Sequence, residues 1–177
     1  MIKGIFMKLH SIKLPHFKAS AEMPTLKTLS PSKVVISMSQ HGGVPCTPLV
    51  KTGDEVKTGQ LIGSSEAVIS SPVHASITGK VTGITDVINI VGKRNTAVII
   101  ESSNRQELHE SVKPPVINNR SDFIQAVKNS GSVGLGGAGF PTYVKLNFDP
   151  KEARIDTLLV NAAECEPYIT SDYRAII

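Results

Sequence analysis

A glycine-rich stretch at residues 134–142, followed by Lys145, carries the residues best suited to binding chemistry. Four glycines fall within six positions of it: Gly134, Gly136, Gly137 and Gly139. Because glycine has no Cβ, backbone N–H groups can approach a ligand closely, and a helix opening at Pro141 would add its positive end. A phosphate or a flat ring suits such a loop. The pattern is neither a Walker loop nor a clean G-x-G-x-x-G after a strand, so a plain structural turn stands as an equal alternative.

A second set of candidate residues lies at positions 161–168, directly after a predicted buried strand at 155–160. Ligands of α/β sheets bind at the carboxyl ends of strands, so the position favours a site. Asn161 could hydrogen-bond the edge of a heterocycle, and the carboxylates of Glu164 and Glu166 could orient a sugar or an amide. On residues alone, two glutamates that only decorate a surface loop are an equal alternative.

The cysteines indicate neither a disulfide framework nor a metal or iron–sulfur site. Cys46 and Cys165 are far apart, and neither belongs to a C-x-x-C pair. We expect two ordinary reduced thiols in a cytosolic protein.

The net charge of +4 over 177 residues comes from the N-terminal segment, since residues 1–33 hold six lysines and one glutamate. These lysines are spread out, with Phe6 and Phe17 as the only aromatic residues among them. A nucleic-acid site would show a denser patch or stacking aromatics, so we predict an extended basic arm that does not bind nucleic acid. The sequence also contains no apolar run of the roughly 18 residues that span a bilayer.

Short runs rich in Val and Ile predict an all-β module at residues 34–104. Gly, Pro or Asp turns separate the predicted strands, which are residues 34–39, 47–51, 60–63, 67–70, 79–85 and 96–102. A polar stretch with paired prolines, residues 105–120, is the predicted linker.

Residues 121–177 predict the first part of an α/β domain. Ser121 is a candidate cap for a helix over residues 122–130, with Gly131 at its end. Thr170 or Ser171 can cap a last helix.

Both candidate loops resemble loops of known flavoproteins. Residues 134–142 with Lys145 resemble the flavin-binding glycine loop of two families: the NADH-oxidising subunit of respiratory complex I, and the RnfC subunit of the Rnf electron-transport complex. Residues 161–167 are similar to the companion loop of these families. Upstream, residues 40–45, 50–60 and 71–75 resemble the segment that precedes the flavin region in the RnfC family.

The resemblance implies an α+β multidomain protein: a β-rich barrel-sandwich hybrid domain of the biotinyl/lipoyl-like kind, followed by the start of an α/β domain that binds FMN and NAD(H). It implies one component of a membrane-associated, ion-translocating ferredoxin:NAD⁺ oxidoreductase, peripheral at the cytoplasmic face, with the other Rnf subunits as partners and ferredoxin as an indirect one. Two [4Fe–4S] clusters would be bound by residues outside this chain.

The resemblance also implies roles for the site residues. The contacts to FMN would come from Gly134, Gly136, Gly137, Gly139 and Lys145. Asn161 and Glu164 would lie at the ring or ribityl side of the flavin, and Glu166 would face the nicotinamide nucleotide.

Departures from the pattern limit what is carried over. The complex I loop has Arg where Leu135 stands and Asp where Ala163 stands, so contacts of those two side chains are not transferred. We expect the chain to be the N-terminal part of a longer protein and to bind no cluster by itself.

Three other functions were weighed against the same residues, and one of them is rejected. The β module resembles biotinyl and lipoyl carrier domains, but no lysine lies between Lys57 and Lys80, so we reject a swinging-arm carrier. A soluble reductase of the proline reductase or cobalamin reductase type stays open. So does a non-catalytic docking scaffold, in which the glycine loop only packs.

Overall fold

The computed structural model describes residues 14–15, 17–24, 26, 31–89, 92–135, 137–149, 155–157, 159 and 168–176. The chain forms two compact units, Leu29–Ile155 and a second unit of Met1–Thr28 with Asp156–Ile177.

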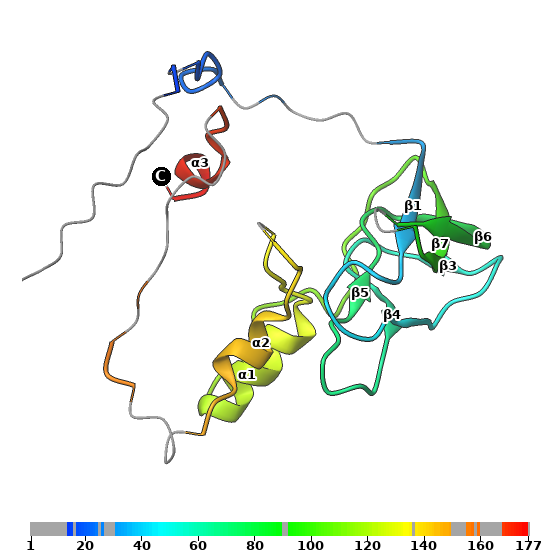
Figure 1. Ribbon diagram of the computed structural model, residues 1–177. Helices are drawn as coiled ribbons and strands as arrows, with labels where there is room; N and C mark the ends of the chain where they lie inside the picture. The colour runs from blue at the N-terminus through cyan, green and yellow to red at the C-terminus, as the bar shows by residue number, and fades with distance from the viewer. Residues whose placement is uncertain are drawn as a thin grey trace, which may run out of the picture. The chain divides into compact units, whose positions relative to one another are not determined.

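Two antiparallel sheets build the β module of the larger unit (Figure 1). The first has the strand order β1-β7-β6-β3, with bounds β1 (Lys33–Ser37), β7 (Arg94–Ser102), β6 (Gly79–Ile88) and β3 (Glu55–Val56). The second has the order β2-β4-β5, with bounds β2 (Thr47–Pro48), β4 (Leu61–Ser64) and β5 (Val73–His74).

The core lies where aliphatic residues of both sheets meet. In the first sheet Val34 pairs with Ile100, and Ile100 with Val81. Alternate residues of a strand point to one face, so this register stacks three aliphatic side chains on the same side. The buried cluster consists of Ile36, Met38, Cys46, Val56, Ile62, Val73, Ala75, Ile77, Val81, Val98 and Ile100. The predicted β-rich fold class is confirmed.

One predicted strand is wrong. Residues 67–69 form bends instead of a strand, residue 70 lies outside any strand, and Val68 is 85% exposed. The segment is fixed by hydrogen bonds outside any sheet, such as that from the Val44 N–H to the Ile69 carbonyl at 3.0 Å. Strand β3, which pairs Glu55 with Lys80, was not predicted because two residues carry no periodic signal.

Helices α1 (Arg120–Asn129) and α2 (Thr142–Leu146) follow the β module and lie side by side (Figure 1). Asn119, and not the predicted Ser121, caps α1: its side chain accepts a hydrogen bond from the Asp122 N–H at 3.0 Å. The predicted stop is confirmed, since Gly131 has a φ of 73° and its N–H bonds to the Lys128 carbonyl.

The first residues of the stretch predicted as a linker are bonded to the β module. The Thr58 N–H donates to the Glu107 carbonyl at 3.0 Å, and the His109 N–H donates to the Thr58 carbonyl at 2.9 Å. These bonds attach residues 107–109 beside β3; the domain bounds themselves stay a prediction.

In the smaller unit, part of the N-terminal segment contacts the last helix, α3 (Ser171–Ile176). The Arg174 guanidinium donates hydrogen bonds to the carbonyls of Ala21 and Met23, and the rings of Phe17 and Tyr168 lie 6.1 Å apart. The predicted strand at 155–160 is not formed at the residues that are described there, 155–157 and 159. None of the helices in the described part of the chain has the length and hydrophobicity of a bilayer-spanning segment.

Candidate functional site

The glycine loop, residues 134–140, is closed by its own backbone. The Gly134 N–H donates to the Phe140 carbonyl at 3.0 Å, and Val133 forms an antiparallel bridge with Pro141. The Thr142 N–H donates to the Ser132 carbonyl at 3.0 Å. The predicted contribution of a helix end is therefore small, because α2 has five residues and its first N–H already has a partner.

Gly139 serves the packing of the loop against the β module. Its φ is +62°, and a Cβ there would stand 3.1 Å from the Cα of His41. Its carbonyl accepts a hydrogen bond from the Gly42 N–H at 2.9 Å. Only a residue without a side chain fits both the backbone conformation and the close approach.

Lys145 lies beside the start of the loop. Its Nζ is 3.4 Å from the position that a Cβ would take on Gly134. The lysine comes from the last turn of α2 and is exposed. A positive charge at this place suits a phosphate, for which lysine acts as a point charge.

Gly137 presents open backbone. It is exposed, and a Cβ built on it would meet no described atom within 4 Å. Leu135, two residues earlier, is 95% exposed. The middle of the loop therefore offers peptide groups that a ligand could approach directly. Gly136 lies outside the described residues.

A cluster of polar contacts in the β module adjoins the glycine loop, where the Gly42 N–H bonds to the Gly139 carbonyl. Nε2 of His41 is 3.1 Å from the Val44 carbonyl and 2.9 Å from Oγ of Ser70, which is 3% exposed. Tyr143 of α2 donates its hydroxyl proton to the Val68 carbonyl at 2.7 Å. We call residues 40–44 and 68–70 the barrel platform. Sequence reasoning missed His41, Ser70 and Tyr143, because their partners are distant in the chain.

Cys46 borders the platform. Its Sγ lies 3.7 Å from Oγ of Ser70 and donates to the Ser71 carbonyl at 3.1 Å. Burial raises the pKa of the Cys46 thiol, and the neighbouring Ser70 hydroxyl offsets part of this rise. A buried thiol that holds its proton is typical of a structural group.

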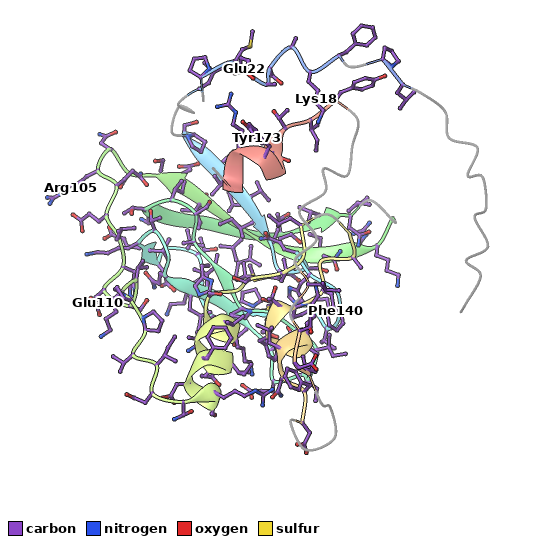
Figure 2. The ribbon with its side chains drawn as sticks, turned by 90° about the vertical axis from the view of Figure 1, so that its left-hand side faces the viewer. Lys18, Glu22, Arg105, Glu110, Phe140 and Tyr173 are labelled. Carbon is purple, nitrogen blue, oxygen red and sulfur yellow. The ribbon has the colours of Figure 1, made fainter. Side chains whose placement is uncertain are left out.

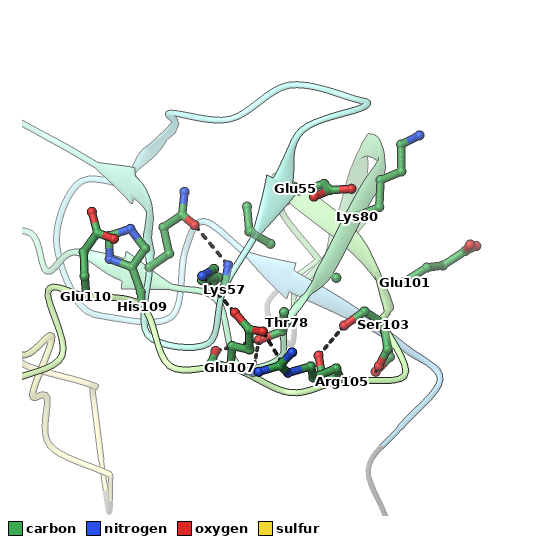
Figure 3. Close-up of a pocket in the computed structure, with 14 residues that line it drawn as sticks. Glu55, Lys57, Thr78, Lys80, Glu101, Ser103, Arg105, Glu107, His109 and Glu110 are labelled. Atoms are coloured by element: carbon green, nitrogen blue, oxygen red, sulfur yellow. Dashed lines mark hydrogen bonds and ion pairs between the residues drawn. The ribbon is translucent and has the colours of Figure 1, made fainter.

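A charged hollow of about 670 Å³ lies on another part of the larger unit, beside β3 and β6 (Figure 3). The Lys57 Nζ is 2.8 Å and the Arg105 Nε 2.9 Å from the Glu107 carboxylate. Lys57 holds the pKa of Glu107 below its usual value, and Glu107 raises the pKa of Lys57. Figure 2 shows Arg105 and Glu110 on the opposite side of this unit from Phe140 of the glycine loop.

A second hollow, of about 980 Å³, lies between the β module and α1. Its lining includes His74, Val112, Pro114, Pro115 and Ala126. Neither hollow is lined by residues of the glycine loop.

The second candidate loop cannot be compared with these contacts, since Asn161, Glu164 and Glu166 lie outside the described residues, as does Cys165. Within the described ranges, no three His, Cys, Asp or Glu side chains are grouped so as to hold a metal ion.

Comparison with known families matches both parts of the chain. Residues 9–105 match the RnfC barrel sandwich hybrid domain, and residues 127–177 match the Nuo51 FMN-binding domain. The fold thus defines a class of protein in which a barrel-sandwich hybrid domain precedes the start of an FMN-binding domain.

Curated relatives agree with this class, and each is the C component of an oxidoreductase complex. The relative from the Na⁺-translocating ferredoxin:NAD⁺ oxidoreductase complex of Acetobacterium woodii is 43% identical over 88% of this chain and 36% of the relative. The relative from the proton-translocating complex of Clostridium ljungdahlii is 38% identical over 90% of the chain and 35% of the relative. The relative from the ion-translocating oxidoreductase complex of Serratia proteamaculans is 38% identical over 90% of this chain and 23% of the relative.

The chain belongs to the RnfC family. It spans about a third or less of the length of these curated relatives. The resemblance seen in the two loops and the β module is confirmed.

Proposed function

We propose that this chain is part of a protein that passes electrons between NAD(H), FMN and iron–sulfur clusters in a membrane-associated, ion-translocating ferredoxin:NAD⁺ oxidoreductase. The relatives are named as subunits of such complexes, and residues 127–177 match an FMN-binding domain. The other Rnf subunits are the proposed partners. They would hold the protein at the cytoplasmic face of the membrane, with ferredoxin reached through them.

The glycine loop is the proposed FMN site. The observation that carries this proposal is the open backbone at Gly137, where a Cβ would meet no described atom within 4 Å. Lys145, beside Gly134, adds a cation for the phosphate of FMN. These residues fit a planar ring with an attached phosphate, which needs both close backbone approach and a positive charge.

Within this site, residues of this chain would bind and orient FMN and the nicotinamide nucleotide. Lys145 would neutralise the phosphate, while peptide groups near Gly136 and Gly137 would lie against the flavin. Asn161 and Glu164 are proposed for the ring or ribityl side, and Glu166 for the nicotinamide nucleotide. Bound FMN supplies the exchange between two-electron hydride transfer and single-electron transfer to the clusters.

The docking scaffold is the second candidate, and one observation favours it. Gly134 and Gly139 use backbone groups for contacts within the protein, as a loop that only packs would do. A loop that only packs would not explain the open backbone at Gly137.

Flavin analysis of the whole protein separates the two candidates. Purified anaerobically and then heated, it should release about one FMN per chain, and NADH should bleach the oxidised-flavin absorbance before heating. A protein that folds and joins its complex without flavin would support the scaffold.

A further inference from the structure

The glycine loop is seated on the barrel platform by close backbone contacts. The Gly42 N–H donates to the Gly139 carbonyl at 2.9 Å. A Cβ on Gly42 would stand 3.0 Å from the Ala138 carbonyl oxygen, and one on Gly139 would stand 3.3 Å from the Gln40 carbonyl oxygen. The platform therefore touches the C-terminal half of the loop, next to the open backbone of Gly137.

His41 fixes the shape of the platform. The Val44 carbonyl can only accept, so Nε2 of His41 carries the proton and donates to it at 3.1 Å. The Ser70 hydroxyl also donates to the Val44 carbonyl, at 2.9 Å, so its oxygen accepts from the same Nε2 at 2.9 Å. One imidazole thus ties the turn at 40–44 to the segment at 68–70.

A second anchor joins the platform to the helix after the loop. Tyr143 is 8% exposed, and its hydroxyl donates to the Val68 carbonyl at 2.7 Å. Since Val68 adjoins Ile69, whose carbonyl accepts from the Val44 N–H, both anchors meet in the platform. The loop is held from Gly139 on one side and from α2 on the other.

We infer that the β module positions the flavin loop, with His41 as the positioning residue, so that the affinity for FMN depends on the barrel platform. This inference rests on the proposed function, because it takes the glycine loop to be the FMN site. It gives the barrel-sandwich domain a role in the flavin site without direct contact between His41 and the flavin.

The test measures FMN affinity in the whole protein after the flavin is removed and FMN is titrated back. Three variants loosen the platform: His41→Asn, Ser70→Ala and Tyr143→Phe. His41→Gln is the conservative variant, because the amide nitrogen of glutamine can reach the acceptors of Nε2. The side chain of asparagine is one carbon shorter and does not reach them. Flavin fluorescence gives the Kd, and visible circular dichroism reports how the ring is held.

Thr78→Val is the matched control for lost stability. Thr78 donates to the Glu107 carbonyl at 2.7 Å and accepts from the Thr58 N–H at 3.1 Å, so valine removes bonds of the β module in the charged hollow. The change should lower the Tm and leave the platform unaltered.

We expect His41→Asn and Ser70→Ala to weaken FMN binding about tenfold, as the loss of one or two hydrogen bonds implies. The flavin dichroism should change, and His41→Gln should restore most of the affinity. Thr78→Val should bind FMN as wild type does, at temperatures well below its Tm.

Two results would overturn the inference and leave the proposed function intact. In one, wild-type Kd values in all platform variants would show that the loop does not depend on His41. In the other, an equal loss in Thr78→Val would show that only stability matters. If the wild-type protein itself takes up no FMN, that result contradicts the proposed function, and with it the inference that depends on it.

Discussion

The Nζ of Lys145 lies 3.4 Å from the position that a Cβ would take on Gly134, so the glycine loop begins beside a positive charge. The two residues come from different elements, a loop and the last turn of α2. This arrangement places a cation beside the glycine loop, where it could neutralise a phosphate.

Replacing this charge should weaken flavin binding. In the whole protein we expect Lys145→Gln to raise the Kd for FMN about ten- to a hundredfold, because one charge-assisted bond contributes roughly 1.5–3 kcal/mol. Flavin fluorescence titration measures it. Lys80→Gln, which removes an exposed lysine of β6, is the control and should bind FMN normally. Equal affinity in both variants would remove Lys145 from the site.

Glu166 should act on the nucleotide and not on the flavin. In the whole protein we expect Glu166→Gln to lower kcat/KM for NADH about ten- to a hundredfold while FMN stays bound, since the amide keeps the shape and loses the charge. Steady-state kinetics with NADH and ferricyanide give the value. An unchanged kcat/KM would mark an exposed surface glutamate, and loss of flavin would move Glu166 to the FMN side.

Cys46 should resist alkylation in the folded chain. Burial raises the pKa of its thiol, and the thiolate is the reactive form. We expect little labelling by iodoacetamide near neutral pH and full labelling in denaturant, as read by peptide mass spectrometry. Similar rates in both conditions would show that the thiol is accessible.

His74 should make the stability of the β module depend on pH. Burial lowers its pKa from the usual 6.5, so the unfolded chain takes up a proton more readily than the folded one. The free energy of unfolding is therefore unaffected above pH 6.5 and falls as the pH drops below it.

Urea unfolding at about pH 7.5 and about pH 5.5 measures this change, and His74→Gln should reduce the difference. Glu107 does not interfere, because Lys57 holds its pKa below the usual 4.5. A His74→Gln variant with the full wild-type pH dependence would assign the effect to other groups.

The β module was predictable because its strands carry dense Val and Ile with turn residues between them. The same composition misled at residues 67–70, where Val68 and Ile69 form bends at the surface beside the platform. Composition records which residues favour strands, and it does not record whether a partner strand is present.

The helix cap and the platform show two further limits. Asn119 and Ser121 are both good caps, and two residues of shift lie within the usual uncertainty of helix ends. The glycine loop was found from its spacing alone. The contact between His41 and Ser70 was not, because Ser70 is 29 positions away and only folding brings the two together.

If FMN lies against the open backbone of the glycine loop, Gly137→Val should displace it. A Cβ at this place would meet no described atom within 4 Å, so the fold should be retained, whereas a ligand on the backbone would meet a branched side chain. Gly83→Val in β6 is the matched control, since a Cβ there makes only an ordinary contact, 3.7 Å from Ile99.

The measurement is the FMN content of each purified whole protein, together with its Tm. We expect Gly83→Val to keep its flavin and Gly137→Val to lose it, with affinity lower by about ten- to a hundredfold, as overpacking of roughly 1–3 kcal/mol implies. A Gly137→Val protein with full FMN content and a wild-type Tm would contradict the account, because the flavin would then lie elsewhere.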